Sequence, residues 1–299
     1  MVAHTPLHHA TALEEELGGE IRLKLESLQR TGSFKIRGAY NFVAQMSGPE
    51  SAKGIITYSS GNHAQAVALA AHLHGIRAVV VMPVTATDVK IKGSARLGAE
   101  VILEGVTSLD RKVMAESIAE TEGLSIVPPF DHMDIIAGQG TVGIEIAEDW
   151  EDFDTVLLPI GGGGLCGGSA AALRRLKPEA TILGVEPRGA ASMLSALKNG
   201  EPVTIENVDS IADGLLPVRV GSHTFRHVQE FVDDVIVVSD QDIKEAAAFL
   251  FASQKLVVEY SGAVTVAALR GGHLDTRGRK TVAVISGGNI DPAIIASLE

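Results

Sequence analysis

The sequence predicts an α/β protein with a doubly wound, mostly parallel sheet in a large domain and a smaller inserted α/β domain. Three observations carry this prediction: short unbroken apolar runs, alanine-rich segments of helical spacing between them, and glycine-rich turns after several of the runs. Unbroken apolar runs are typical of strands that are covered on both faces. Because such runs alternate with helices, we expect a parallel sheet that binds its ligand at the carboxyl ends of the strands.

The expected strands lie, in chain order, at residues 54–58, 78–82, 100–104, 155–160, 181–186, 234–239 and 281–286. The clearest helical segments are 64–72, 109–121 and 241–254. The first three strand–helix units are expected to form the small domain, residues 54–130. Residues 1–53 together with 131–299 are then expected to form the large domain.

The composition excludes several classes of protein. The 299 residues carry a formal net charge of -12, which argues against nucleic acid or an anionic membrane surface as a partner. The single cysteine, Cys166, cannot form an intramolecular disulfide and fits a reducing compartment. The N-terminus shows no secretory signal pattern, and no apolar run reaches membrane-spanning length. We therefore expect a cytoplasmic protein with a small-molecule ligand.

A run of four glycines, Gly161, Gly162, Gly163 and Gly164, separates an expected strand from an expected helix. Backbone N–H groups in such a turn can converge on an anion, and the helix N-terminus adds positive potential. The run therefore predicts a phosphate site. Its spacing also satisfies the dinucleotide fingerprint, with Glu186 at the end of the next strand, so an NAD-dependent dehydrogenase stays open here.

Lys35 stands in the first turn of another expected helix, between the apolar residues Phe34 and Ile36. A helix N-terminus and apolar neighbours both disfavour a protonated lysine. A neutral lysine amine is what Schiff-base chemistry requires. By these local properties alone, however, a solvated surface lysine is the commoner case.

Four segments in order carry a resemblance to a known family: SFKIRGA at 33–39, SGNHAQ at 60–65, GGGG at 161–164 and SGGN at 286–289. The chain resembles the threonine/serine dehydratase and serine racemase family, which are fold type II enzymes dependent on pyridoxal 5'-phosphate (PLP). The resemblance runs from Thr5 almost to the C-terminus. It implies the fold type II architecture, PLP as cofactor, and the glycine run as a cradle for the PLP phosphate.

The resemblance also implies roles for individual residues. Lys35 would bind PLP covalently and act as the catalytic base, and Ser60 would be an acid or base on the opposite face of the cofactor. Asn62 would bond the 3-oxygen of PLP, and Ser286 its ring nitrogen. The other implied cofactor-binding residues are Phe34, Gly161, Gly162, Gly163, Gly164, Leu165, Gly214, Glu259 and Gly287, and the implied substrate-binding residues are Ser59, Ser60, Asn62 and His63.

The implied reaction is α,β-elimination of L-threonine or L-serine, giving 2-oxobutanoate or pyruvate and ammonia. Alternatives within the same fold are a serine or aspartate racemase and a 3-hydroxyaspartate dehydratase. More distant alternatives are a non-catalytic PLP-binding protein and the dehydrogenase. The resemblance further implies a homodimer.

Racemase-like members of the family bind a divalent metal after the strand that ends here in Gly184-Val185-Glu186-Pro187. Glu186 is kept, and Ala190 would offer its carbonyl, but Ser192 stands where a second carboxylate is expected. Loss of one carboxylate weakens a site for a hard divalent cation. Whether a divalent or a monovalent cation binds is left open by the sequence.

Overall fold

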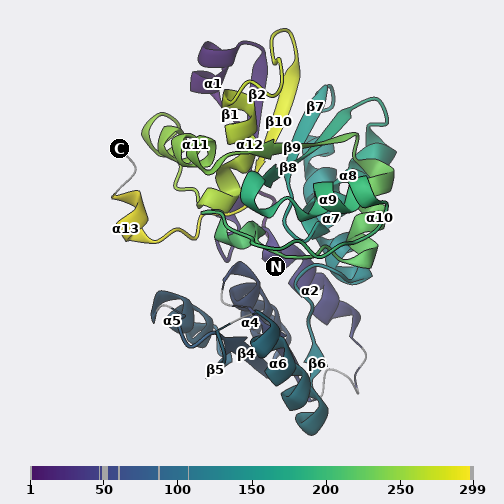
Figure 1. Ribbon diagram of the computed structural model, residues 1–299, viewed down its shortest axis with the longest axis vertical. Coiled ribbons are helices and arrows are strands. Elements are labelled where there is room, and N and C mark those ends of the chain that lie inside the picture. The colour runs from purple at the N-terminus through teal and green to yellow at the C-terminus, as the bar shows by residue number, and fades with distance from the viewer. Residues whose placement is uncertain are drawn as a thin grey trace.

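The computed structural model describes residues 2–46, 48, 53–59, 61–86, 88–106 and 108–296 (Figure 1). Figure 1 shows a six-stranded sheet with helices in the upper part and a four-stranded sheet with its helices below. The strands are β1 (Leu7–His9), β2 (Glu20–Leu25), β3 (Ile55–Tyr58), β4 (Ala78–Met82), β5 (Glu100–Leu103), β6 (Ser125–Ile126), β7 (Thr155–Pro159), β8 (Thr181–Pro187), β9 (Asp234–Val238) and β10 (Lys280–Ile285).

The helices and 3-10 turns connect these strands. They are α1 (Thr11–Leu17), η1 (Glu26–Leu28), α2 (Lys35–Gln45), α4 (Asn62–His74), α5 (Asp88–Arg96), α6 (Ser108–Glu122), α7 (Met133–Asp149), α8 (Gly164–Leu176), η2 (Arg188–Ala190), α9 (Ser192–Asn199), η3 (Asp213–Leu215), α10 (Ser222–Phe231), α11 (Asp240–Ala252), α12 (Tyr260–Arg270) and α13 (Pro292–Ile295).

The large sheet has the strand order β1-β2-β10-β7-β8-β9, and only the β1–β2 pair in it is antiparallel. Its side chains alternate between two hydrophobic cores. In β10, Ala283 and Ile285 pack with α1, α11 and α12, whereas Val282 and Val284 pack with α7, α8, α9 and α10. Helices therefore cover both faces, and the predicted doubly wound, mostly parallel fold is confirmed.

All seven predicted strands are present within one or two residues of their expected ends. The sequence patterns missed β1, β2 and the two-residue strand β6. Strand β2 contains Arg22 and Lys24, which interrupt the apolar run. Lys24 is nevertheless fully buried, because Glu145 and Asp149 of α7 pair with its amine at 2.8 and 3.1 Å.

The small sheet has the strand order β5-β4-β3-β6 and is parallel throughout. All four strands fall within the expected range 54–130. The core on one face of this sheet, however, also contains Ile36, Ala39 and Val43 of α2, together with Ile135. The packing thus extends beyond the predicted small domain, because α2 lies against α4 as well as against α7.

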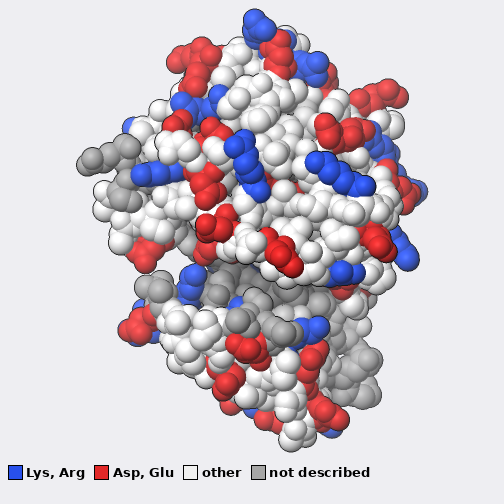
Figure 2. Space-filling model, in the orientation of Figure 1, with Lys and Arg blue, Asp and Glu red and all other residues white. Residues whose placement is uncertain are grey.

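Acidic and basic side chains are interspersed on the face seen in Figure 2, without a continuous basic stripe. This fits the net charge of -12 spread along the chain. Within the described part of the chain, none of the helices has the length and apolar character needed to span a bilayer.

Candidate active site

The turn before Lys35 is joined to the loop after β10 by backbone hydrogen bonds. Ser33 forms an antiparallel bridge with Gly287, and the Phe34 N–H donates to the Ser286 carbonyl at 3.1 Å. The Gly288 N–H donates to the Gly32 carbonyl at 2.9 Å. Since β10 lies between β2 and β7, these bonds bring Lys35 to the carboxyl edge of the sheet, where Gly161 also follows its strand.

Lys35 is the first residue of α2, as predicted, and its side chain points into the protein. Its Nζ donates to the Pro129 carbonyl at 2.8 Å and lies 5.2 Å from the centroid of the Phe34 ring. Burial lowers the pKa of Lys35 to about 8, although the nearby Glu259 carboxylate acts in the opposite direction. The amine is thus easier to deprotonate than that of an exposed lysine.

Asn62 begins α4 and connects the small sheet to the loops of the large one. Its Nδ2 donates to Oε1 of Glu259 at 2.7 Å. Burial and the negative charge of Asp213 raise the pKa of Glu259 to about 8, against the opposing effects of Asn62, Lys90 and Lys35. Gly287 makes this contact possible, since a Cβ there would lie 2.0 Å from Glu259 Oε1.

His63, the next residue, is buried and neutral. Its Nε2 contacts the Val127 carbonyl at 3.1 Å, and because a carbonyl only accepts, Nε2 carries the proton. Burial and the Lys35 charge lower the pKa of His63 to about 3, and the Val127 bond opposes them. Its Nδ1 is a buried acceptor that has no partner in the described part of the chain. The Oγ of Ser59 accepts a hydrogen bond from the Gly61 N–H at 3.4 Å. Ser60 lies outside the described residues.

The four glycines join β7 to α8. Helix α8 begins at Gly164, and its N-cap residue Gly163, with φ of 91°, provides no side-chain cap. The first turn of α8, which contains Leu165, has no acidic residue. The positive end of the helix is therefore available to an anion. The glycines also serve packing, since a Cβ on Gly162 would lie 2.2 Å from the Phe130 ring.

Ser286 follows β10 and is buried, with its Oγ donating to the Ser261 carbonyl at 3.3 Å. The hydroxyl of Ser261 in turn accepts the Gly214 N–H at 2.8 Å. Gly214 must be a glycine there, because its Cβ would approach that hydroxyl to 2.9 Å. The structure therefore brings two predicted cofactor residues together through Ser261, which the sequence motifs did not single out.

These residues fit PLP. A lysine amine of lowered pKa suits a covalent bond to its aldehyde carbon, and the uncapped glycine turn suits its phosphate. Ser286 would donate its hydroxyl to the ring nitrogen in place of the Ser261 carbonyl, and Asn62 would donate an N–H to the 3-oxygen. Within the described residues, the buried Nδ1 of His63 and Oγ of Ser33 have no hydrogen-bond partner, as expected where a polar ligand completes the site.

Glu186 is placed differently from a simple metal ligand. Its Oε1 accepts the Met193 N–H at 2.8 Å and its Oε2 the Leu194 N–H at 2.9 Å, so it caps the N-terminus of α9. Burial raises the pKa of Glu186 to about 7. Among the described residues, no group of three or more His, Cys, Asp or Glu side chains is placed to hold a metal. A cation at Glu186 and Ala190 stays a prediction.

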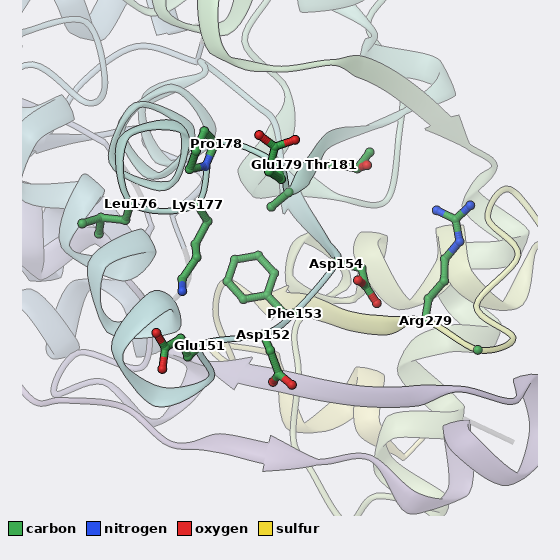
Figure 3. Close-up of a pocket in the computed structure, with 12 residues that line it drawn as sticks. Glu151, Asp152, Phe153, Asp154, Leu176, Lys177, Pro178, Glu179, Thr181 and Arg279 are labelled. Carbon is green, nitrogen blue, oxygen red and sulfur yellow. The ribbon is translucent and has the colours of Figure 1, made fainter.

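A surface hollow of about 520 Å³ lies elsewhere, at the amino ends of β7 and β8 (Figure 3). It is lined by residues such as Phe153, Glu179 and Arg279. The glycine run and Ser286 follow the opposite ends of their strands. This hollow is therefore separate from the candidate active site, and geometry at the carboxyl ends carries the functional assignment.

The sequence patterns missed the contacts of three residues on the segment before α7. The Pro129 carbonyl accepts the Lys35 amine, and the Phe130 ring covers Gly162. Asp131 then accepts the backbone N–H groups of residues 222–224, which begin α10. No local pattern marks this segment, since its importance comes from the elements that it joins.

Comparisons with known proteins agree with the site. The family model for pyridoxal-phosphate-dependent enzymes matches residues 1–287. L-threonine ammonia-lyase from Thermotoga maritima is 44% identical over 295 residues, which are 99% of this chain and 73% of that protein. A processed threonine deaminase isoform 2 from Solanum lycopersicum matches with a TM-score of 0.95 at 38% identity, covering 99% of this chain and 87% of that one.

A serine racemase from maize is also similar, with a TM-score of 0.94 at 34% identity, covering 99% of this chain and 91% of that one. The resemblance inferred from the four motifs is confirmed, and so is the fold that it implies. The chain belongs to the family of pyridoxal-phosphate-dependent enzymes, and PLP is its cofactor.

Proposed function

We propose that this enzyme is an ammonia-lyase that converts L-threonine, L-serine or both into the corresponding 2-oxo acid and ammonia. The observation that carries the proposal is the buried Lys35 amine of lowered pKa, which donates to the Pro129 carbonyl on a helix whose preceding turn is bridged to Gly287. Similarity to a threonine ammonia-lyase over 99% of the chain supports it.

When bound, PLP supplies an electrophilic carbon for the substrate amine and an electron sink for charge that develops at Cα. The chain's own residues do the rest. The N-terminus of α4 and the Ser59–His63 turn receive the substrate carboxylate. Lys35 Nζ accepts the Cα proton, which its lowered pKa permits near neutral pH. The β-hydroxyl takes up one proton and leaves as water, which balances the proton lost from Cα, and hydrolysis of the resulting enamine consumes one water and releases ammonia.

Ser286 favours elimination over slower alternatives. A serine hydroxyl can donate to an unprotonated ring nitrogen, whereas a carboxylate would keep that nitrogen protonated. A neutral ring is the weaker electron sink, so charge at Cα is relieved by prompt loss of the β-substituent. The same argument makes transamination the less favourable outcome.

The test is a substrate panel of L-threonine, L-serine, 3-hydroxyaspartate and D-serine, scored for ammonia, 2-oxo acid and chirality. We expect stoichiometric ammonia and 2-oxo acid from L-threonine or L-serine. Turnover of 3-hydroxyaspartate alone would replace the proposed substrate with that alternative. No product from any substrate, in protein that carries bound PLP, would refute the lyase proposal.

Serine racemisation is the second candidate, and similarity to the maize serine racemase favours it. It requires a second acid or base opposite Lys35, and Ser60 of the SGNHAQ motif is the residue predicted for that role. D-serine formed by the parent and lost in Ser60→Ala would support a racemase. Absence of D-serine from the parent protein would exclude it.

The expected homodimer and cytoplasmic location belong to the same proposal, as does the absence of nucleic-acid and membrane partners. Light scattering during size-exclusion chromatography is expected to give twice the chain mass of 31.3 kDa. A monomer of that mass would contradict the dimer without affecting the proposed chemistry.

A further inference from the structure

Asn289 joins three segments that meet at the candidate site. Its Nδ2 donates to the Thr31 carbonyl at 2.8 Å and to Oδ1 of Asn62 at 2.7 Å. Thr31 precedes the Lys35 turn, whereas Asn62 begins the helix that packs on the small sheet. The SGGN motif contains Asn289, but neither the motif nor the proposed reaction gives this side chain a role.

The direction of these bonds is determined by the backbone. A carbonyl oxygen accepts and cannot donate, so the Asn289 group that faces Thr31 must be the NH2 group. The second hydrogen of that NH2 group then points at Asn62, which must present its oxygen. The NH2 group of Asn62 is consequently turned away, toward Glu259, to which it donates at 2.7 Å.

Packing keeps Asn289 in this position although the residue is exposed. Its Oδ1 lies 2.4 Å from the place of a Cβ on Gly32, whose φ is 71°. Only a glycine at 32 leaves this room and adopts that backbone conformation without strain. Gly287 likewise leaves room for the Glu259 carboxyl group, which accepts the hydrogen bond from the Asn62 amide.

We propose that Asn289 is a positioning residue that orients the Asn62 amide, so that an Asn62 N–H and not its oxygen faces the 3-oxygen of PLP. One Asn62 hydrogen is used by Glu259, and the other, which has no acceptor among the described residues, is left for the cofactor. Without Asn289, the amide can turn by 180° and present an acceptor to another acceptor. The inference rests on the proposed role of Asn62 in holding PLP.

The experiment measures PLP binding to the apoprotein by absorbance titration in the parent, Asn62→Ala, Asn289→Ala, Asn289→Asp and the double alanine variant. Asn289→Ala is expected to weaken binding by about fivefold, as for the loss of one hydrogen bond. Asn289→Asp is expected to weaken it more, because a carboxylate accepts the Asn62 N–H and turns its oxygen outward. In the Asn62→Ala background, Asn289→Ala is expected to have no further effect.

A second measurement is the pH midpoint of the bound cofactor's absorbance. An N–H that donates to the 3-oxygen favours its deprotonated form, so the midpoint is expected to rise in both Asn62→Ala and Asn289→Ala. The matched control is Asn199→Ala. Asn199 also donates from Nδ2 to a backbone carbonyl, that of Ser195 at 2.7 Å, but it lies at the end of α9. Neither readout is expected to change there.

The outcomes separate two failures. Unchanged PLP affinity in Asn62→Ala would overturn the proposed role of Asn62 and the inference with it. Weakened binding in Asn62→Ala, with either no effect of Asn289→Ala or an independent additive effect, would overturn only the role of Asn289. A further rise of the midpoint when Asn289→Ala is added to Asn62→Ala would do the same.

Discussion

Arg37 lies two residues after Lys35, at the centre of a buried ionic network. Its guanidinium contacts both oxygens of Glu26 at 2.8 Å and both oxygens of Glu145 at 2.6 and 2.8 Å. Its side chain is 1% exposed and that of Glu26 is fully buried. The network joins α2 to η1 and α7, so it holds the Lys35 helix against the large sheet.

Arg37→Leu keeps apolar volume but leaves the Glu26 carboxylate, among the described residues, with the Thr5 hydroxyl as its one side-chain hydrogen-bond partner. Removing one partner of a buried ion pair costs about 3–5 kcal/mol, because the remaining charge is uncompensated. In a chain of this size, 1 kcal/mol lowers the thermal midpoint by about 2 °C. We therefore expect Arg37→Leu to lower the midpoint by about 6–10 °C.

Thermal unfolding of the apoprotein, followed by far-UV circular dichroism, measures this shift. Arg277→Leu is the matched control, since Arg277 forms a similar two-pronged pair with Asp275 in which the arginine is 78% exposed. It is expected to leave the midpoint unchanged, because solvent screens exposed pairs. Arg37→Leu combined with Glu26→Leu is expected to recover part of the loss. Equal shifts in Arg37→Leu and Arg277→Leu would refute the argument that burial makes the network important.

Three further predictions concern the site itself. Lys35→Ala is expected to abolish 2-oxo acid formation and to leave the circular dichroism spectrum unchanged. In the apoprotein, the rate of Lys35 acylation as a function of pH should have its midpoint near pH 8 rather than 10.5. A midpoint above pH 10 would contradict the lowered pKa. Gly162→Ala is expected to displace the Phe130 ring and weaken PLP binding by about tenfold or more, measured by titration, since overpacking costs about 1–3 kcal/mol. Because the pKa of Glu259 is raised from 4.5 to about 8 in the folded protein, its stabilising contribution is present below pH 4.5 and is lost by about pH 8. The free energy of unfolding of the apoprotein should therefore fall between these pH values, and it should fall less in Glu259→Gln. Urea denaturation at several pH values measures this free energy. An unchanged dependence on pH in Glu259→Gln would assign the effect to other groups.

Much of the fold was predictable because it depends on local patterns. The strands at 78–82 and 181–186 are apolar at nearly every position, which is what burial on both faces requires. The start of α2 at Lys35 and of α8 at Gly164 follows from turn residues that adjoin them in the chain. Four short motifs then predicted the family, and the comparisons confirmed it.

Contacts between distant segments could not be predicted in this way. Strand β2 was missed because Lys24 looks like a surface residue until α7 supplies the carboxylates that neutralise it. Phe130 lies over Gly162, and Asn289 reaches Asn62, only because the order of strands in the sheets brings their loops together. Neither spacing nor composition encodes these distances.

The sequence by itself therefore determined the fold class and the cofactor, and it predicted Lys35 as the residue that binds the cofactor. Those properties reside in backbone patterns and contiguous motifs. The tertiary structure decided how easily the Lys35 amine loses its proton, because burial lowers its pKa to about 8. The same fold places the amine against the Pro129 carbonyl. It also decided the direction in which the Asn62 amide points, since hydrogen-bond polarity depends on which groups meet and not on their order along the chain.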